Sequence, residues 1–186
     1  RFRQALQYAI NCEEIVKQIQ LGYGQCAVVG VPLGAAGVPA DLKPYPYYPA
    51  KAKQLLNEAG MEGAAFTYYI RLPGRWSFES ETHQAISGYW TAIGLKPALQ
   101  VVESTAYIAW SKISVGLPPE VKEPPKATLP MYAVEVSAGV MDTASILVPY
   151  GTCRGAYSLY CNPAMDAIFQ KALAAAGEER IRLTEQ

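Results

Sequence analysis

The apolar pattern between residues 66 and 136 changes repeatedly from the period of a strand to the period of a helix, and this alternation limits the possible folds. Residues 66–72 (FTYYIRL) are aromatic and β-branched, which is typical of a strand, whereas apolar residues recur at helical spacing over 78–93. The same patterns predict, in order, a strand over 96–103, a helix over 105–115 and a strand over 131–136. Strands that alternate with helices predict an α/β fold, whose mixed or parallel sheet is flanked by helices.

Capping residues mark helix boundaries elsewhere in the chain. Asn11 is a good N-cap for a helix over 13–19, and Glu14, three residues later, forms a capping-box-like pair with it. A helix over 49–60 begins with a proline and ends on a glycine. Further helices are predicted over 2–10 and 163–176.

Two stretches are too rich in proline and glycine for regular structure. Residues 28–48 are expected to form a long irregular connection, with one short strand at 27–29. Residues 116–130 (GLPPEVKEPPKATLP) are expected to form a surface loop or a semi-extended linker. The length of the chain is that of one domain, so residues 1–186 are interpreted as a single domain.

Charge and hydropathy exclude several classes of function. The chain has 186 residues, of which 51% are hydrophobic and 17% are charged, and its 16 basic and 16 acidic residues cancel. A chain without net positive charge lacks the electrostatic footprint of a nucleic-acid or anionic-lipid partner. No apolar stretch reaches the roughly 18 to 20 residues that span a bilayer, so no membrane anchor is predicted within this sequence.

Residues able to carry catalysis or to hold a metal are scarce. The one histidine, His83, is expected on a solvated helix face, and the cysteines contain no Cys-x-x-Cys pair, so no metal or cofactor site is predicted. The sequence contains neither a P-loop nor a dinucleotide-binding motif. The chain is therefore predicted not to be an enzyme. A hydrolase that uses a cysteine with His83 is the less favoured alternative.

The even number of cysteines suits an oxidising compartment. Cys153 and Cys161 flank a loop rich in glycine and tyrosine, and Cys12 and Cys26 bracket one helix and turn, so each pair could form a disulfide. The alternative is that some or all of the cysteines are small buried apolar residues. Spacing alone does not decide between the two, because it does not show whether the Cα atoms approach within about 7 Å.

Four phrases distributed along the chain resemble those of a known protein family. They are RFRQALQYAIN at 1–11, YYPAKAKQLLNEAG at 47–60, IGLK at 93–96 and YCNPAMD at 160–166. In this order, they are similar to the phrases of the family 5 extracellular solute-binding proteins, the oligopeptide, dipeptide and nickel binders of ABC importers. The phrase at 47–60 is the most specific of the four.

This resemblance implies one lobe of a periplasmic-binding-protein-like fold of type II, cluster C. Residues 1–186 would be the second lobe of a two-lobe receptor that is periplasmic or lipid-anchored and that closes on its solute by a hinge motion. The implied partners are an oligopeptide or other small solute, the permease subunits of an ABC importer, and a missing first lobe of the same protein. Nickel, haem or another non-peptide solute is the alternative cargo.

The sequence departs from the family phrases at Tyr48, which replaces a helix-capping aspartate, and at Val136, where the family often places a tryptophan. Asp142 falls where an acidic residue of the family can pair with the amino terminus of a peptide, although capping of the following helix explains it equally well. Arg154 could bind a ligand carboxylate, but exposure to solvent is favoured. The remaining candidates for the cleft are aromatic, with core packing as the alternative for each: Trp76, Trp110, Tyr132 and Tyr150.

Overall fold

The computed structural model describes residues 1–27, 30–31, 34–72, 76–105, 131–132, 141–155, 158 and 161–186. Contacts between Cα atoms divide the chain into two compact units. Unit 1 comprises Arg1–Cys26, Pro44–Tyr107 and Lys126–Ala133, and unit 2 comprises Ala27–Lys43, Ile108–Pro125 and Val134–Gln186. The interpretation of 1–186 as one domain stays a prediction, because compact units need not fold independently.

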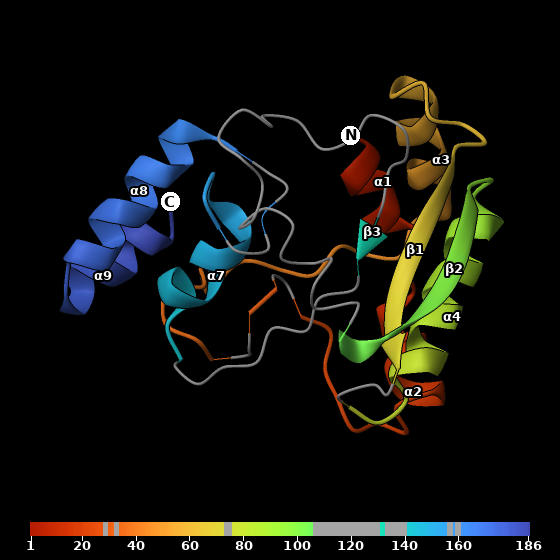
Figure 1. The fold of residues 1–186 in the computed structure, drawn as a ribbon, viewed down its shortest axis with the longest axis horizontal. Coiled ribbons are helices and arrows are strands. Elements are labelled where there is room, and N and C mark those ends of the chain that lie inside the picture. Colours follow the sequence, from red (N-terminus) through yellow and green to blue (C-terminus); the bar gives the residue numbers. More distant parts are fainter. Residues whose placement is uncertain are drawn as a thin grey trace. The chain divides into compact units, whose positions relative to one another are not determined.

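Unit 1 is built on a three-stranded parallel sheet (Figure 1). Strand β1 (Ala65–Leu72) lies between β2 (Lys96–Glu103) and β3 (Met131–Tyr132). Ala65 is in register with Lys96, and Tyr68 with Met131. The predicted α/β alternation with parallel neighbours is therefore confirmed. Outside the described residues lie almost all of the predicted helix over 105–115, the loop over 116–130, and most of the predicted strands at 27–29 and 131–136.

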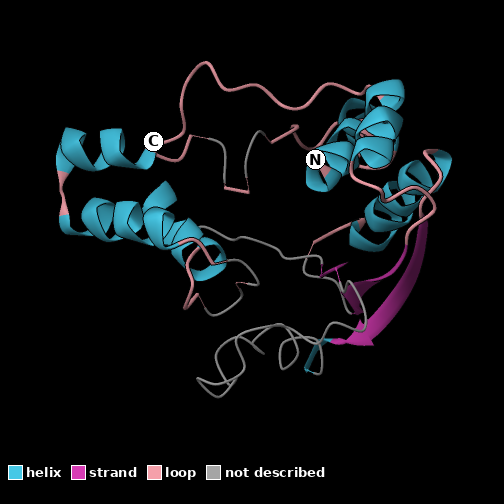
Figure 2. Cartoon of the chain, turned by 90° about the horizontal axis from the view of Figure 1, so that it is seen from above, coloured by secondary structure: helices cyan, strands magenta, loops and turns pink. Residues whose placement is uncertain are grey.

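Four helices accompany the sheet in the described part of unit 1: α1 (Phe2–Tyr8), α2 (Cys12–Gln18), α3 (Pro49–Glu58) and α4 (Glu79–Ala92). Figure 2 shows these helices gathered on one side of the strands. Asn11 caps α2 as predicted, because its side chain accepts a hydrogen bond from the N–H of Glu14. The Asn11 amide also donates to the Glu14 carboxylate at 3.1 Å, so both members of the predicted pair are engaged.

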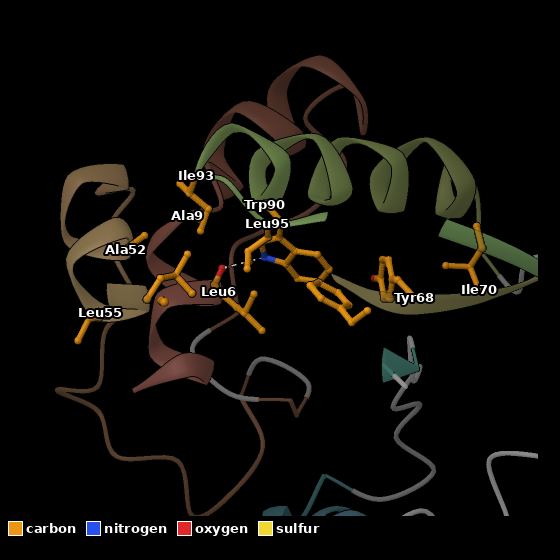
Figure 3. Packing of buried hydrophobic residues seen from close by; sticks show 12 residues of the cluster. Leu6, Ala9, Ala52, Leu55, Tyr68, Ile70, Trp90, Ile93 and Leu95 are labelled. Atoms are coloured by element: carbon orange, nitrogen blue, oxygen red, sulfur yellow. Dashed lines mark hydrogen bonds between the residues drawn. The ribbon is translucent and has the colours of Figure 1, made fainter. Parts of the chain in front are cut away.

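The core of unit 1 lies between β1 and helices α1, α3 and α4 (Figure 3). Trp90 of α4 is 4% exposed, and its ring packs edge-on against Phe66 and Tyr68 of β1. The indole Nε1 of Trp90 donates to the carbonyl oxygen of Leu6 at 3.1 Å, which joins α4 to α1. This bond satisfies the polar atom of a ring that is otherwise surrounded by apolar side chains.

Tyr48 occupies the N-cap position of α3 without a side-chain capping bond. Replacing it with aspartate is expected to raise the free energy of unfolding by about 1 kcal/mol, because a carboxylate can accept from the unpaired N–H groups of the first turn. Tyr48→Ala is the control, since it removes the half-exposed ring without supplying an acceptor. Urea denaturation followed by circular dichroism measures both variants. Equal stabilities of Tyr48→Asp and Tyr48→Ala would show that no cap forms.

Unit 2 contributes three helices to the described residues: α7 (Thr143–Gly151), α8 (Pro163–Ala174) and α9 (Gly177–Thr184). Helix α8 begins at the predicted proline, and Asn162 caps it by accepting from the N–H of Ala164 at 3.0 Å. Residues 34–43 form no helix or long strand, which agrees with the predicted irregular connection. Their one ladder contact is a parallel bridge between Ala36 and Asp142, which holds this connection against the start of α7.

Candidate functional site

The parallel strands β1 and β2 of unit 1 end at one edge of the sheet, where their last residues, Leu72 and Glu103, are in register. We call this the carboxyl edge. Open α/β sheets bind their ligands outside the carboxyl ends of the strands, where the connections to the next elements diverge. The connection from β1 to α4 leaves from this edge, and residues 76–78 of it are described.

A buried ion pair anchors this connection at both of its ends. Arg71 near the end of β1 is 8% exposed and Glu79 at the start of α4 is 5% exposed, with 3.8 Å between Nε and Oε1. Burying a charged group without a partner costs free energy. Each member of the pair therefore supplies the partner that the other needs, which links the end of β1 to the start of α4. Sequence reasoning missed this pair. A charge at each end of one strand-to-helix connection is the only signal that could have suggested it.

His83 of α4 lies against β1 and is not on a solvated helix face, so that prediction is wrong. Its Nδ1 is 2.5 Å from the hydroxyl oxygen of Tyr68, and the ring of Trp76 lies 6.1 Å away between centroids. Burial lowers the pKa of His83, while the nearby Glu79 carboxylate opposes this shift. Burial therefore favours the neutral imidazole, which packs between α4 and β1.

Asp142 caps helix α7 and is also bound by an arginine from the C-terminal helix. Its Oδ2 accepts from the N–H of Ser145 at 2.9 Å. The Arg180 guanidinium donates to both carboxylate oxygens, at 2.9 Å from Nε and 2.7 Å from Nη2. Arg180, with a smaller contribution from Ser145, holds the pKa of this carboxyl well below its usual range. Capping, one of the two explanations for Asp142, is thus observed, while a role in ligand binding stays a prediction.

Arg180 also fixes the end of α8. Its Nη1 donates to the carbonyl oxygens of Ala172 and Leu173, both at 3.1 Å, and its Nη2 donates to the hydroxyl of Ser145 at 3.0 Å. The last carbonyls of a helix lack partners within the helix, so a cation at this point satisfies them and complements the helix dipole. One side chain therefore joins α7, α8 and α9.

The other predicted ligand-binding residues belong to different elements, with Tyr132 in unit 1 and Tyr150 and Arg154 in unit 2. Arg154 is exposed and Tyr150 is half-buried in the last turn of α7. Tyr132 is the last described residue of β3 and is in register with Tyr69 of β1, and Trp110 lies outside the described residues. Their roles in ligand binding stay predictions.

All four cysteines are bonded in the structure. Disulfides join Cys153 to Cys161 and Cys12 to Cys26, with Cα atoms 4.1 and 5.8 Å apart. The N–H of Cys153 also donates to the carboxylate of Asp166 in the first turn of α8, at 3.0 Å. A cysteine in a disulfide carries no thiolate, so this arrangement provides no nucleophile for the Cys–His hydrolase alternative.

Neither metal clusters nor membrane-spanning helices occur in the part of the chain that the structure describes. No three histidine, cysteine or acidic side chains gather there as metal ligands would. Likewise, none of the helices found there combines the length and apolarity needed to cross a bilayer.

Comparison with known proteins identifies relatives that bind small solutes. A family model described as "Bacterial extracellular solute-binding proteins, family 5 Middle" matches residues 1–158. The dipeptide-binding protein of Escherichia coli (strain K12) is 30% identical over 115 residues, which are 60% of this chain and 22% of that protein. The heme-binding protein A of Haemophilus influenzae is 34% identical over 99 residues, 52% of this chain and 18% of that protein.

The fold is also similar to that of solved periplasmic binding proteins. The periplasmic binding protein DppA from Helicobacter pylori, solved in complex with the peptide STSA, superposes with a TM-score of 0.78 at 23% identity. The match covers 98% of this chain and 34% of that one. At this identity the likeness shows the fold, which is that of part of a periplasmic binding protein. The residues that match in sequence make up about a fifth of the length of those relatives.

Proposed function

Because the chain belongs to the family 5 bacterial extracellular solute-binding proteins, we propose that it forms part of the substrate-binding component of an ABC importer. The observation that carries this proposal is the family match over residues 1–158, which includes the whole parallel sheet and its carboxyl edge. In this role residues 1–186 contribute one wall of a cleft for a peptide-like solute. The other wall belongs to a first lobe outside this sequence.

A receptor of this kind performs no covalent chemistry. Its solute binds the closed form more tightly than the open form, and this difference in affinity shifts the population toward closure by a hinge motion. The closed form then delivers the solute to the permease subunits. That the relatives are binding proteins supports a protein without enzymatic activity.

A peptide-like solute is proposed over other cargo because dipeptide- and di/tripeptide-binding proteins recur among the relatives. A haem-binding and a glutathione-binding relative show that the family accommodates other solutes. Within the proposed cleft, Asp142, Arg154, Tyr132, Tyr150 and Trp110 are the candidate contacts. Arg154 is the exposed cation among them and suits a solute carboxylate.

The proposed location is the periplasm or the outer face of the cell membrane, with a lipid anchor in the latter case. Two disulfides support an exported protein, because reducing compartments keep cysteines as thiols. The family match supports both the location and the permease partnership.

The experiment is calorimetric titration of the mature protein, purified from the cells that make it, with di- to pentapeptides. We expect at least one peptide to bind with micromolar or tighter affinity, and native mass spectrometry of the same preparation to show a retained peptide-like solute. Residues 1–186 alone should bind the same peptides no more tightly than the millimolar range, because half of the contacts are missing.

Two outcomes would contradict this proposal. Micromolar binding by residues 1–186 alone would refute a half-site, and a mature protein that retains haem or a metal complex and ignores peptides would reassign the cargo. A peptide hydrolysis assay before and after thiol alkylation provides the control for the hydrolase alternative. No turnover is expected in either sample.

A further inference from the structure

Two residues other than glycine adopt a left-handed backbone among the described residues: Leu21, with a φ of +54°, and Phe78, with a φ of +64°. Side chains rarely tolerate this conformation, because Cβ comes too close to the following carbonyl oxygen. Such a residue persists only where the surrounding structure enforces it, and a glycine would fit there with less strain.

Leu21 is explained by the end of helix α2. The N–H of Gly22 donates to the carbonyl oxygen of Val16 at 2.9 Å and the N–H of Tyr23 donates to that of Gln20 at 2.8 Å, so Leu21 lies in a hydrogen-bonded turn that follows α2. Its side chain is 64% exposed. The conformation of Leu21 thus follows from local hydrogen bonds, which makes this residue a matched control for Phe78.

Phe78 lies at the other end of a helix, immediately before α4. Its carbonyl oxygen accepts from the N–H of Thr82 at 2.9 Å, and its side chain makes no capping hydrogen bond. The aromatic ring is 40% exposed, although Phe78 is followed directly by the buried Glu79. Arg71 and Glu79, which form the buried ion pair, lie on either side of the connection, and Glu79 directly follows Phe78.

The position of Phe78 in the fold indicates a role in ligand binding for its partly exposed ring. The connection that carries it leaves the carboxyl edge of a parallel sheet, which is where open α/β sheets bind ligands. An aromatic ring on a fixed backbone offers a large apolar contact area at a small cost in conformational entropy. We propose that Phe78 contacts the solute and that its ring binds a large apolar side chain of a peptide-like ligand. This inference rests on the proposed function and extends it to the class of solute.

The test uses Phe78→Ala and Phe78→Gly in the mature protein, titrated with alanyl-phenylalanine and with dialanine. Both variants lack the ring, so both should bind alanyl-phenylalanine about tenfold more weakly than the wild type, with the affinity for dialanine within about twofold. Phe78→Gly should melt at a higher temperature than Phe78→Ala, because only glycine relieves the left-handed backbone. The two variants are therefore expected to share the same weakened affinity for alanyl-phenylalanine but to differ in melting temperature.

Leu21→Ala and Leu21→Gly are the matched controls. They should reproduce the difference in melting temperature and leave the affinity for both peptides unchanged. If Phe78→Gly binds alanyl-phenylalanine like the wild type while Phe78→Ala does not, Phe78 is a structural residue and the inference is overturned. Unchanged affinity in both Phe78 variants overturns it as well. A wild-type protein that binds neither peptide, nor any longer one, instead refutes the proposed function.

Discussion

Replacing Trp90 with alanine is expected to lower the free energy of unfolding of unit 1 by about 3–5 kcal/mol. The ring is 4% exposed and contacts Phe66 and Tyr68, so its removal leaves a cavity between α4 and the sheet. It also leaves the carbonyl oxygen of Leu6 without its donor. A loss of this size is a large part of the stability of an ordinary domain. Urea denaturation followed by far-ultraviolet circular dichroism measures it.

Trp90→Phe separates the loss of apolar packing from the loss of the hydrogen bond to Leu6. Phenylalanine keeps most of the apolar packing but cannot donate to Leu6, so we expect a loss of about 1–2 kcal/mol. Ile70 is fully buried in β1, and hydrogen exchange at its amide should rank the wild type, Trp90→Phe and Trp90→Ala in this same order of decreasing stability. A Trp90→Ala loss below about 1 kcal/mol would mean that α4 does not pack on β1 through this ring.

The helices and strands were largely predictable because their signals are local. Strand β2 has the predicted bounds, Lys96–Glu103, since alternating apolar residues and the flanking glycine both lie within a short window. The caps Asn11 and Asn162 act where the sequence pattern places a helix start. Parallel pairing followed from the alternation of strands and helices, since parallel strands need a crossover connection.

The side-chain contacts between distant residues were not predictable. Trp90 and Leu6 are 84 positions apart, and Arg180 and Asp142 are 38 positions apart. Such pairs depend on how whole elements pack, which local periodicity does not encode. His83 illustrates the consequence, because its polar neighbours in sequence indicate a solvated face, while the packing of α4 on β1 turns its ring toward Tyr68.

The candidate site was predictable only in outline. The family phrases lead to the correct family, and the alternation of strands and helices leads to a parallel sheet. They do not show that Asp142 already has a partner within the chain, nor that Phe78 adopts a left-handed backbone. Both facts arise from tertiary structure, and both bear on which residues remain available to a solute.

Arg180→Ala is expected to lower the free energy of unfolding of unit 2 by about 2–3 kcal/mol. Arg180 donates to the carboxylate of Asp142, to the hydroxyl of Ser145, and to the carbonyls of Ala172 and Leu173, so its removal deletes these hydrogen bonds of α9 with α7 and α8. Both members of the ion pair remain about one fifth exposed, and solvent screening therefore keeps the loss below that of a fully buried pair. Denaturant unfolding with hydrogen exchange in α8 measures the effect, and Arg154→Ala, which removes an exposed arginine, is the control.

The pH dependence of this loss identifies its electrostatic part. Because the pKa of Asp142 is lowered in the folded protein, the unfolded chain binds a proton at this carboxyl first as the pH falls. The stabilisation is therefore complete above the ordinary aspartate pKa of about 3.9 and is lost progressively below it. The difference between the wild type and Arg180→Ala should stay constant from about pH 7 to pH 5 and should shrink below about pH 4. Asp142→Asn cannot titrate, so adding Arg180→Ala to it should cost the same at every pH. A difference that shrinks equally in the Asp142→Asn background would assign the effect to another carboxyl group.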